Sequence, residues 1–443
     1  METLSVTFSY ESTLKIPLLL VEVTPFDILI GVKVPGQPSI SYESLNPVPF
    51  KSLEDVVLSF LERSPEFHNL NSAVVALPQN FLTPQQMTMP PPPFNTWVFD
   101  LSLFKKATGL SNVVFIDRAT VIGKAVPLLR ASDFFVFSGQ QAAYFNVPKS
   151  TYMIAVTDET YESAFLSYKE ASKNWESTKS LVNNLELNTH NESFQSVLNA
   201  MGQSVSFPFP TLTFFFSDQG IEKLYATLYE DNDMEIFLKR QIQASPMVLQ
   251  KGAPTDVDSL ELNNVITRSS LEGLDVSISA IEQASPQAVR NASSFLPLSL
   301  KNTLSGSQDD LNWNLLRALP FETIIKGAFS FKGVPFQSNA FPVSSAILPS
   351  ALEKFCFDCL NMWSALLGET LGQQALILNA KGGVFLSGRL LLLIKALLSD
   401  LSLNSAFEKE IVGQASFMET SFALITNPTS AFLGMISFFE DQS

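Results

Sequence analysis

The first residue that could do chemistry is Asp117, which directly follows a short apolar run at residues 113–116. Such a run is typical of a buried strand. A carboxylate at the end of a strand can accept a proton from a substrate hydroxyl. It can equally cap the helix that follows, and the residues around Asp117 leave both roles open.

Glycines flank a second short apolar run, at residues 384–386. Gly382 and Gly383 precede this run, and Ser387 and Gly388 follow it. Glycine lets the backbone come close to a ligand or to another part of the chain. The stretch could border a bound ligand, but taken by itself it favours a tightly packed turn in an α/β core.

Cys356 and Cys359 form a Cys-x-x-Cys motif inside a helical pattern. The chain has 2 cysteines and 2 histidines. A zinc site takes four ligands, so these few candidates favour a half-buried helix face over a metal site. We therefore expect no metal site, and the shortage of histidines also argues against a Ser–His–Asp triad.

The balance of charge and hydropathy excludes several classes of protein. The chain has 443 residues, is 46% hydrophobic and has a net charge of −15, with no run of basic residues. This balance argues against binding to nucleic acid or to an anionic membrane. No apolar run reaches about 18 residues without a charge, so no membrane-spanning segment is expected.

The sequence also indicates where the protein resides. Its first residues have no basic stretch before an apolar core, so no secretory signal is expected. Two cysteines cannot form a disulfide framework, which fits a reducing compartment. We expect an intracellular protein, in the cytoplasm or alternatively in an organelle.

The N-terminal part of the chain alternates between strand-like and helix-like patterns. Apolar runs at residues 18–23 and 28–34 predict a hairpin at the edge of a sheet. Residues 73–77 and 113–116 predict buried strands, and residues 101–108 predict a short helix. Strands that alternate with helices indicate an α/β domain.

The rest of the chain contains further strands and two segments of different composition. Apolar runs at residues 153–156 and 207–216 predict buried strands. Residues 160–205 are polar and helix-prone, and residues 230–262 are rich in acidic residues and turn formers, so we predict both as insertions. Residues 352–378 predict a long helix that leads into the glycine-flanked run.

The glycine-flanked run is also where the chain resembles a known family. Its sequence at residues 382–388, Gly-Gly-Val-Phe-Leu-Ser-Gly, resembles a segment of the bacterial-type glucokinases. Residues 425–428, Ile-Thr-Asn-Pro, and residues 431–434, Ala-Phe-Leu-Gly, resemble the C-terminal strand, turn and helix start of that family. The chain thus resembles a divergent glucokinase of the hexokinase-like, actin-like ATPase superfamily.

This resemblance implies an α/β protein of two lobes with the actin-like ATPase fold, which is ribonuclease H-like. The small lobe would comprise residues 1–136 and would be completed by residues 420–443. The large lobe would comprise residues 137–419 and would carry the insertions at residues 160–205 and 230–262. A sugar would bind in the cleft between the lobes.

The resemblance also implies where the phosphate-binding loops should be, and both differ here. The first loop aligns with residues 22–27, where both glycines are missing, Pro25 replaces one of them and Phe26 replaces a hydroxyl residue. The second loop aligns with residues 159–163, which contain two glutamates and no glycine. Proline has no N–H group to donate to a phosphate, and carboxylates repel phosphates.

The sugar-binding side chains that the resemblance implies are replaced as well. Pro210 aligns with a sugar-binding glutamate of the family, and Thr213 aligns with a histidine. A second sugar carboxylate would align with Asn263 and Asn264. Since an apolar run cannot satisfy the hydroxyl groups of a sugar, we expect the sugar site to be lost.

The catalytic base implied by the resemblance is the ambiguous case. The family ends a strand with Asn-Asp, and the aspartate takes the proton. One alignment places Asp117 at this aspartate, whereas an alignment from Pro127 places Arg118 there and Asp117 at the asparagine. Both alignments stay open.

We therefore expect a glucokinase-like pseudoenzyme that serves as a binding or assembly component, with a protein partner or as a homo-oligomer. Gly382, Gly383, Ser387 and Gly388 border the nucleotide in the family; here they would be vestigial and kept for folding. The alternative is an active ATP-dependent glucokinase of glycolysis, with Asp117 as its base, glucose as its substrate and Mg-ATP as its cofactor.

Overall fold

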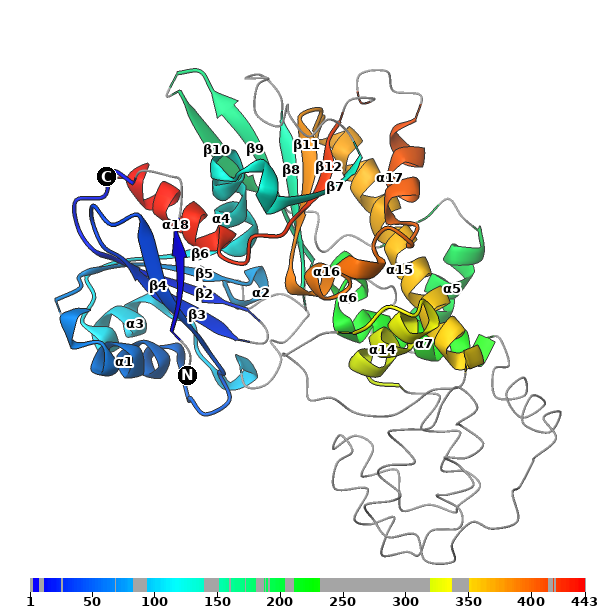
Figure 1. The fold of residues 1–443 in the computed structure, drawn as a ribbon, viewed down its shortest axis with the longest axis horizontal. Helices are drawn as coiled ribbons and strands as arrows, with labels where there is room; N and C mark the ends of the chain where they lie inside the picture. The colour runs from blue at the N-terminus through cyan, green and yellow to red at the C-terminus, as the bar shows by residue number, and fades with distance from the viewer. Residues whose placement is uncertain are drawn as a thin grey trace, which may run out of the picture.

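The computed structural model is built around two β-sheets with helices packed against them (Figure 1). It describes residues 3–7, 12–24, 27–67, 69–82, 94–138, 151–158, 161–171, 173–180, 187, 189, 192–203, 211–231, 319–336, 350–412, 417 and 420–442. The predicted insertion at residues 230–262 lies outside the described residues after Asp231. Other residues singled out above that lie outside them are Pro25, Phe26, Glu159, Thr160, Pro210, Asn263 and Asn264.

The first sheet is formed by the N-terminal part of the chain. Its strands are β1 (Thr3–Thr7), β2 (Leu18–Val23), β3 (Ile28–Lys33), β4 (Ser39–Leu45), β5 (Ser72–Leu77) and β6 (Asn112–Asp117), in the order β1-β4-β3-β2-β5-β6. The accompanying helices are α1 (Leu53–Arg63), α2 (Gln79–Leu82), α3 (Leu101–Thr108) and α4 (Arg118–Ala125).

Strands β2 and β5 are inner strands of the first sheet, and every side chain in them is buried. Continuous buried runs are typical of strands that are covered on both faces. The predicted hairpin of β2 and β3 is confirmed, since the two strands pair antiparallel. Its predicted place at the edge of the sheet is wrong, because β5 pairs with β2 and β4 pairs with β3.

The second sheet collects strands from distant parts of the chain. Its strands are β7 (Phe134–Ser138), β8 (Tyr152–Thr157), β9 (Tyr161–Lys169), β10 (Asn174–Lys179), β11 (Gly383–Ser387) and β12 (Phe422–Ile425), in the order β10-β9-β8-β11-β12-β7. The helices are α5 (Glu192–Gln203), α6 (Leu212–Phe215), α7 (Asp218–Asp231), α14 (Phe321–Phe331), α15 (Ser350–Ile377), α16 (Arg389–Leu393), α17 (Leu403–Ile411) and α18 (Ser430–Glu440).

The two sheets repeat one pairing pattern. In the first sheet β2, β3 and β4 pair antiparallel, while β5 and β6 continue parallel on the other side of β2. In the second sheet β8, β9 and β10 pair antiparallel, while β11 and β12 continue parallel on the other side of β8. In each repeat the last parallel strand is followed by one helix, which is α4 in the first and α18 in the second. The chain therefore has two related lobes.

The predicted insertion at residues 160–205 is not helical over its first half. Residues 161–169 and 174–179 form β9 and β10, which complete the second sheet. The prediction of a helix-prone segment is wrong there because the outer strands of a sheet carry polar residues on their exposed parts. The aromatic side chains of Tyr168 and Trp175, with ring centroids 5.2 Å apart, pack across this pair of strands.

The predicted strand at residues 207–216 is also wrong in its described part. Thr211 caps α6, because its hydroxyl oxygen accepts the N–H of Phe214 at 3.3 Å. Phe215 and Phe216 are completely buried, so the aromatic run fills the core from a helical turn. Burial was predictable from composition, but the helical turn was not.

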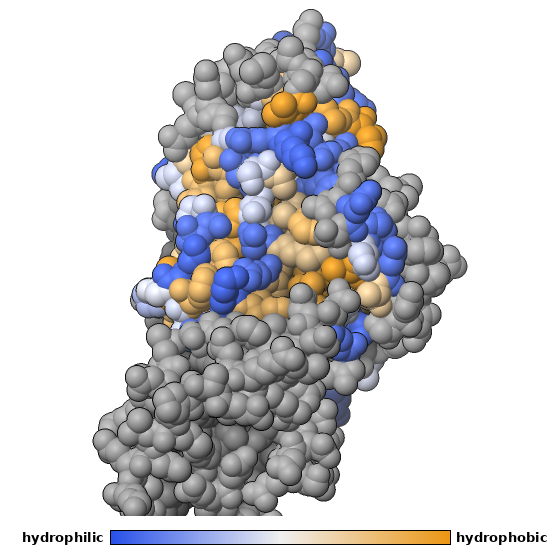
Figure 2. Space-filling model, turned by 90° about the vertical axis from the view of Figure 1, so that its right-hand side faces the viewer, coloured by the Kyte–Doolittle hydropathy of each residue, from blue (hydrophilic) through white to orange (hydrophobic). Residues whose placement is uncertain are grey.

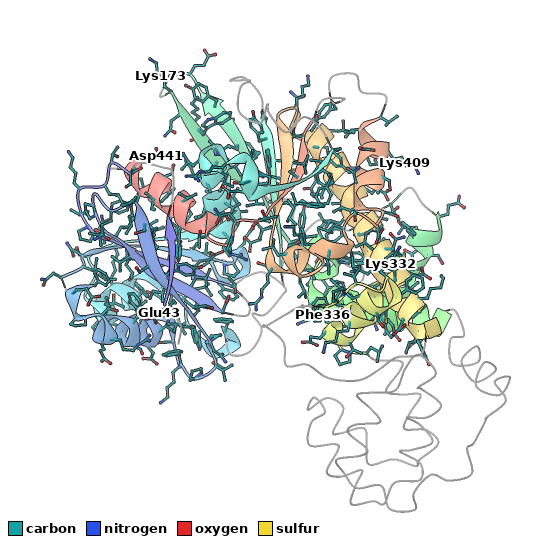
Figure 3. All side chains as sticks on the ribbon, in the orientation of Figure 1. Glu43, Lys173, Lys332, Phe336, Lys409 and Asp441 are labelled. Carbon is teal, nitrogen blue, oxygen red and sulfur yellow. The ribbon has the colours of Figure 1, made fainter. Side chains whose placement is uncertain are left out.

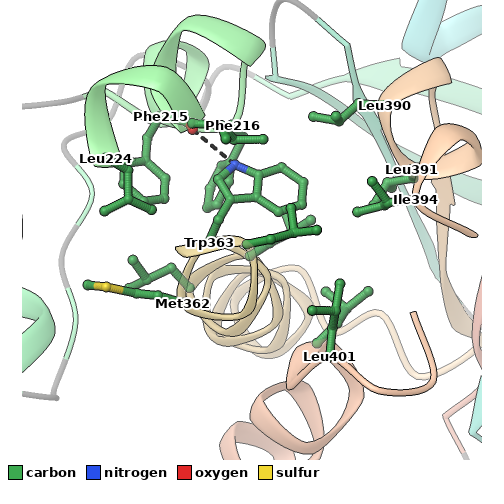
Figure 4. Close-up of a cluster of buried hydrophobic side chains, with 14 of the residues drawn as sticks. Phe215, Phe216, Leu224, Met362, Trp363, Leu390, Leu391, Ile394 and Leu401 are labelled. Carbon is green, nitrogen blue, oxygen red and sulfur yellow. Dashed lines mark hydrogen bonds between the residues drawn. The ribbon is translucent and has the colours of Figure 1, made fainter. Parts of the chain in front are cut away.

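The long helix predicted at residues 352–378 is confirmed as α15, which crosses the core of the second lobe. Trp363 is buried in this helix, and its indole N–H donates to the carbonyl oxygen of Phe215 at 3.1 Å (Figure 4). Leu390 and Leu391 of α16 lie on one side of the same indole ring in Figure 4. The predicted strand at residues 384–386 and the helix start after it are confirmed as β11 and α16.

The two helices that follow the repeats, α4 and α18, pack against each other between the sheets (Figure 1). Gly434 of α18 makes this close contact possible, since a Cβ atom there would lie 1.8 Å from the carbonyl oxygen of Val121. Their apolar side chains join residues of both sheets in one buried cluster, which includes Leu20 and Val74 from the first sheet and Ile154 from the second.

The outer face of the second lobe mixes hydrophilic and hydrophobic residues over its described part (Figure 2). Ile377 and Val412, at the ends of α15 and α17, are 78% and 74% exposed. Single exposed apolar residues of this kind are normal on protein surfaces. Among the described residues, no helix is both long enough and apolar enough to span a membrane.

Candidate functional site

The charged residues at the junction of the two lobes are organised by Arg118, the first residue of α4. Its Nε and Nη2 atoms lie 3.1 Å and 3.0 Å from Oε1 of Glu22 on β2. Its Nη1 donates to Oδ2 of Asp158, which directly follows β8 in the second lobe. Arg118, Glu22 and Asp158 are only 5%, 4% and 2% exposed. One guanidinium thus connects carboxylates of both lobes.

Asp117 caps α4 and does not face these carboxylates. Its Oδ1 accepts the backbone N–H of Thr120 at 2.8 Å, and its Oδ2 accepts the Thr120 hydroxyl at 2.8 Å. Both oxygens of the sequence-predicted base are therefore bound within the first turn of the helix. This geometry is that of an N-cap, the second of the two roles that the sequence left open.

Two further contacts surround the Arg118 group. Oε1 of Glu162 on β9 accepts the backbone N–H of Gln79 at 2.8 Å, which joins the second lobe to the start of α2 in the first. Arg389 of α16 donates its backbone N–H to Oδ1 of Asp158, and its Nη1 lies 3.5 Å from Oδ1 of Asp27. The Gln79–Glu162 and Arg389–Asp27 contacts again join the two lobes, whereas the Arg389–Asp158 contact lies within the second lobe.

The buried charged groups around Arg118 shift one another's pKa values. Burial alone would lower the pKa of Arg118, but the carboxylates of Asp158, Glu22 and Glu162 outweigh burial and raise its pKa above the ordinary value. Burial raises the pKa of Glu22, and the charge of Arg118 opposes this shift. Arg118 therefore stays charged, and the attraction between its guanidinium and the carboxylates is little screened because the group is buried.

The described residues do not fit a magnesium ion of the kind that accompanies ATP. Glu22 and Asp158 are the carboxylates that could ligate such an ion, and both are already bound to Arg118. Among the described residues, no group of three histidine, cysteine or acidic side chains is arranged to hold a metal. Cys356 and Cys359 are fully buried in α15, where burial raises the pKa of both thiols.

The turn that aligns with the first phosphate loop is closed by its own hydrogen bonds. The backbone N–H of Thr24 donates to the carbonyl oxygen of Asp27 at 2.9 Å, and the Thr24 hydroxyl donates to Oδ1 of Asp27 at 2.6 Å. Ser44 donates to Oδ2 of the same carboxylate at 2.8 Å. The described ends of this loop, Thr24 and Asp27, are therefore held together by these hydrogen bonds.

The glycines around β11 allow close packing of the chain against itself. A Cβ atom at Gly388 would lie 2.1 Å from the carbonyl oxygen of Thr157, and φ is +127° there. A Cβ atom at Gly382 would lie 2.5 Å from the ring of Tyr152. Gly383 has a φ of +152°, and Ser387 is 7% exposed at the end of β11. The assignment of Gly382, Gly383, Ser387 and Gly388 as vestigial nucleotide-binding residues stays a prediction, as does that of Asp117 as a base.

The sequence identified some members of this site and missed others. Arg118 entered only as an alternative to Asp117, and Glu22 only as the start of a phosphate loop. Asp158 was missed altogether, because its partner lies 40 positions away in the chain. A signal for Glu22 was nevertheless present, since a carboxylate inside the apolar run Leu18–Val23 must find a buried partner.

Two repeated lobes joined through paired helices define a two-lobed α/β protein with the actin-like ATPase fold. A glucokinase from an Antarctic psychrotroph aligns over 96% of this chain and 99% of its own, with 15% identity and a TM-score of 0.56. The Leishmania braziliensis glucokinase aligns over 97% of this chain and 94% of its own, with 11% identity and a TM-score of 0.54. A Balamuthia mandrillaris glucokinase in complex with glucose aligns over 96% and 93%, with 10% identity and a TM-score of 0.54.

The sequence comparison points to the same class. The glucokinase family model matches residues 332–442. A search of curated proteins finds no match. The C-terminal part of the chain is therefore similar to the glucokinases, and both the family resemblance and the fold class predicted from the sequence are confirmed. The lobe boundaries at residues 136 and 419 stay predictions.

Proposed function

We propose that this chain is a glucokinase-like protein that has lost sugar phosphorylation and acts by binding a protein partner or a second copy of itself. One observation supports the proposal most strongly: the guanidinium of Arg118 is bound between Glu22 and Asp158, where the two lobes meet. The neighbouring Asp117 uses both carboxylate oxygens to cap α4.

Phosphoryl transfer requires a base that can reach the substrate hydroxyl, and donors that hold the nucleotide phosphates. Asp117 would have to give up its cap to act as a base. Three carboxylates, those of Glu22, Asp158 and Glu162, gather around the single guanidinium of Arg118. A nucleotide phosphate placed there would meet an excess of negative charge.

The test is a coupled assay for glucose 6-phosphate on the full chain, with an active glucokinase measured in parallel. We expect no glucose-dependent consumption of ATP above background. A thermal-shift titration with Mg-ATP and glucose should likewise show no stabilisation, whereas a ligand present at 100 times its Kd would add about 2.7 kcal/mol. Turnover that Asp117→Asn abolishes would overturn the proposal.

The alternative function is that of an active ATP-dependent glucokinase with a remodelled site. The match to the glucokinase family model supports it, since residues 332–442 include the glycine-flanked strand β11. In that case glucose would be the substrate and Mg-ATP the cofactor, with Asp117 as the base. The coupled assay separates the two functions directly.

The partner and the location belong to the same proposal. We expect the protein in the cytoplasm, in a complex with a protein partner or as a homo-oligomer. Copurification at a fixed stoichiometry, followed by measurement of mass in solution, would identify such a complex. A monomer that copurifies with nothing would contradict this part of the proposal.

A further inference from the structure

We propose that α4 is a clasp that holds the two lobes in one fixed arrangement without any ligand. The clasp consists of Arg118 and Lys124, at the two ends of α4, with the groups that bind them. The inference goes beyond the proposed function, because a protein that has lost catalysis could still open and close around a ligand.

The first end of the clasp is Arg118. The helix that carries it continues directly from β6 of the first lobe, and Glu22 lies on β2 of the same lobe. Asp158 lies after β8 in the second lobe and binds the same guanidinium. Opening the lobes would have to separate Arg118 from Asp158.

The other end of the clasp is Lys124, in the last turn of α4. Its ammonium group donates to the carbonyl oxygen of Trp175 on β10 and lies 2.5 Å from Oδ2 of Asp441. Asp441, labelled in Figure 3, lies just after α18 and also accepts the side-chain amide of Asn174 at 2.6 Å. The helix is thus attached to the second sheet at both ends.

The body of α4 reinforces both ends. All eight of its residues are buried, and it contacts β8, β9 and β10 of the second sheet as well as α18. Gly123 allows the approach to β10, since a Cβ atom there would lie 2.3 Å from the hydroxyl oxygen of Ser177. Lobe opening would therefore expose apolar surface along the whole helix.

Two contacts outside α4 act in the same direction. The backbone N–H of Gln79 in the first lobe donates to Glu162 in the second at 2.8 Å. Arg389 of the second lobe approaches Asp27 of the first, with 3.5 Å between Nη1 and Oδ1. Separating the buried charges of Arg118 and Asp158 would leave each without its partner, which is strongly unfavourable. The closed arrangement is therefore maintained by the chain itself, and no bound ligand is required.

The experiment measures the distance between the lobes in the full chain. Lys106 on α3 and Lys409 on α17, the latter labelled in Figure 3, are exposed and would be changed to cysteine and spin-labelled. The native cysteines are buried. Pulsed electron resonance should give one narrow distance distribution, unchanged by glucose and Mg-ATP. A distribution that shifts when these ligands are added to the native clasp would overturn the proposal.

Arg118→Met should broaden or shift this distribution, because it removes the guanidinium and leaves Glu22 and Asp158 facing each other. The matched control is Arg63→Met, which removes the Arg63–Glu43 ion pair (2.9 Å) within the first lobe and should leave the distribution unchanged. Asp158→Asn is the second variant, since it removes the charge but retains an oxygen for the N–H of Arg389.

Hydrogen exchange gives a second measurement on the same variants. Amides of β8 and α4 should exchange at least about tenfold faster in Arg118→Met and in Asp158→Asn than in the parent chain. If Arg118→Met does not fold, Asp158→Asn decides the question. Variants that fold and keep the parent distribution and exchange rates would overturn the clasp, whatever the coupled assay shows about catalysis.

Discussion

Asp117 and Arg118 are adjacent at the start of α4, but their side chains make different contacts. Successive residues of a helix point in directions about 100° apart. Asp117 reaches along the helix to Thr120, and Arg118 reaches across to Glu22 and Asp158. The two alignments of the sequence differ by one residue. One places the Asp117 carboxylate at the position of the family's catalytic aspartate, and the other places the Arg118 guanidinium there.

Replacement of Asp117 distinguishes a helix cap from a catalytic base. Asp117→Ala should lower the free energy of unfolding by about 1–3 kcal/mol, because it leaves the buried N–H and hydroxyl of Thr120 unpaired. Asp117→Asn should retain most of the stability, since asparagine caps helices about as well as aspartate. Urea denaturation of the two variants and the parent chain would measure the difference.

The matched control is Asp100, which caps α3 by accepting the N–H groups of Ser102 and Leu103 at 2.8 Å and 2.9 Å. Because this cap is exposed, Asp100→Ala should lower the free energy of unfolding less than Asp117→Ala does. If Asp117→Ala proved as stable as the parent chain, the structural role assigned to Asp117 would be wrong.

At the scale of single residues, the sequence could show which side chains are chemically unusual but not which of them meet. Glu22 is unusual inside an apolar strand, and Arg118 is unusual beside a predicted base. Their contact with Asp158 depends on the joining of two sheets, which no local pattern encodes. The absence of glycine from the segments that align with the family's phosphate loops was readable directly, because it needs only the residue types.

At the scale of helices and strands, α7 and α14 are joined by one carboxylate whose protonation state depends on pH. Glu222 of α7 accepts the backbone N–H of Phe321, the first residue of α14, at 2.8 Å. Burial raises the pKa of Glu222 to about 7; the Phe321 N–H opposes this shift, while the charges of Asp218 and Glu322 add to it. A carboxylate at the start of a helix is normally favourable, but here it lies among other acidic groups.

The pH dependence of stability should report this contact. The folded chain keeps the Glu222 proton up to about pH 7, whereas the unfolded chain loses it near the ordinary glutamate pKa of 4.5. The free energy of unfolding should therefore fall as pH rises from about 4.5 to 7, by on the order of 2 kcal/mol after allowance for partial exposure. Glu222→Gln should remove this decrease in unfolding experiments across the range.

Glu62, an exposed residue of α1, provides the control. Glu62→Gln should leave the decrease in stability between pH 4.5 and 7 in place, because Glu62 lies on α1 in the first lobe, away from the contact between α7 and α14. An unaltered profile in Glu222→Gln would show that other carboxylates, such as Asp218, dominate the titration.

Strong hydropathy patterns predicted the central strands and the long helix correctly, whereas weak patterns led to wrong predictions for the outer elements. The buried runs of β2, β5, β8 and β11 and the long helix α15 were all predictable from hydropathy. Residues 161–179 were predicted as helix-prone because β9 and β10 mix polar and aromatic residues. Residues 212–215 were predicted as a strand because an unbroken apolar run carries no period that separates a strand from a buried helix.

At the scale of the whole molecule, the family resemblance predicted the arrangement in two lobes, which hydrophobic periodicity alone did not predict. Local patterns indicated an α/β domain, and the two-lobed fold followed only from the family resemblance, which is clearest at residues 382–388, 425–428 and 431–434. The repeat itself was not evident, because the two sheets share a pairing order and not a sequence. In space the repeats meet through α4 and α18, whose side chains join both sheets in one cluster (Figure 1).

A substitution at this junction should therefore destabilise both lobes together. Gly434→Ala would place a methyl group 1.8 Å from the carbonyl oxygen of Val121, so α18 would have to move away from α4. We expect a loss of about 1–3 kcal/mol, although alanine favours the helix itself by about 1 kcal/mol over glycine. Ser437→Ala, on the partly exposed side of the same helix, should have little effect.

Hydrogen exchange would show whether the two lobes respond as one unit. Amides of β5 in the first sheet and of β11 in the second should lose protection by similar factors in Gly434→Ala, because the cluster around α4 and α18 contains residues of both sheets. Loss of protection confined to one sheet would mean that the lobes unfold independently. In that case the contacts between them would be too weak to act as a clasp, so this measurement also bears on the role of α4.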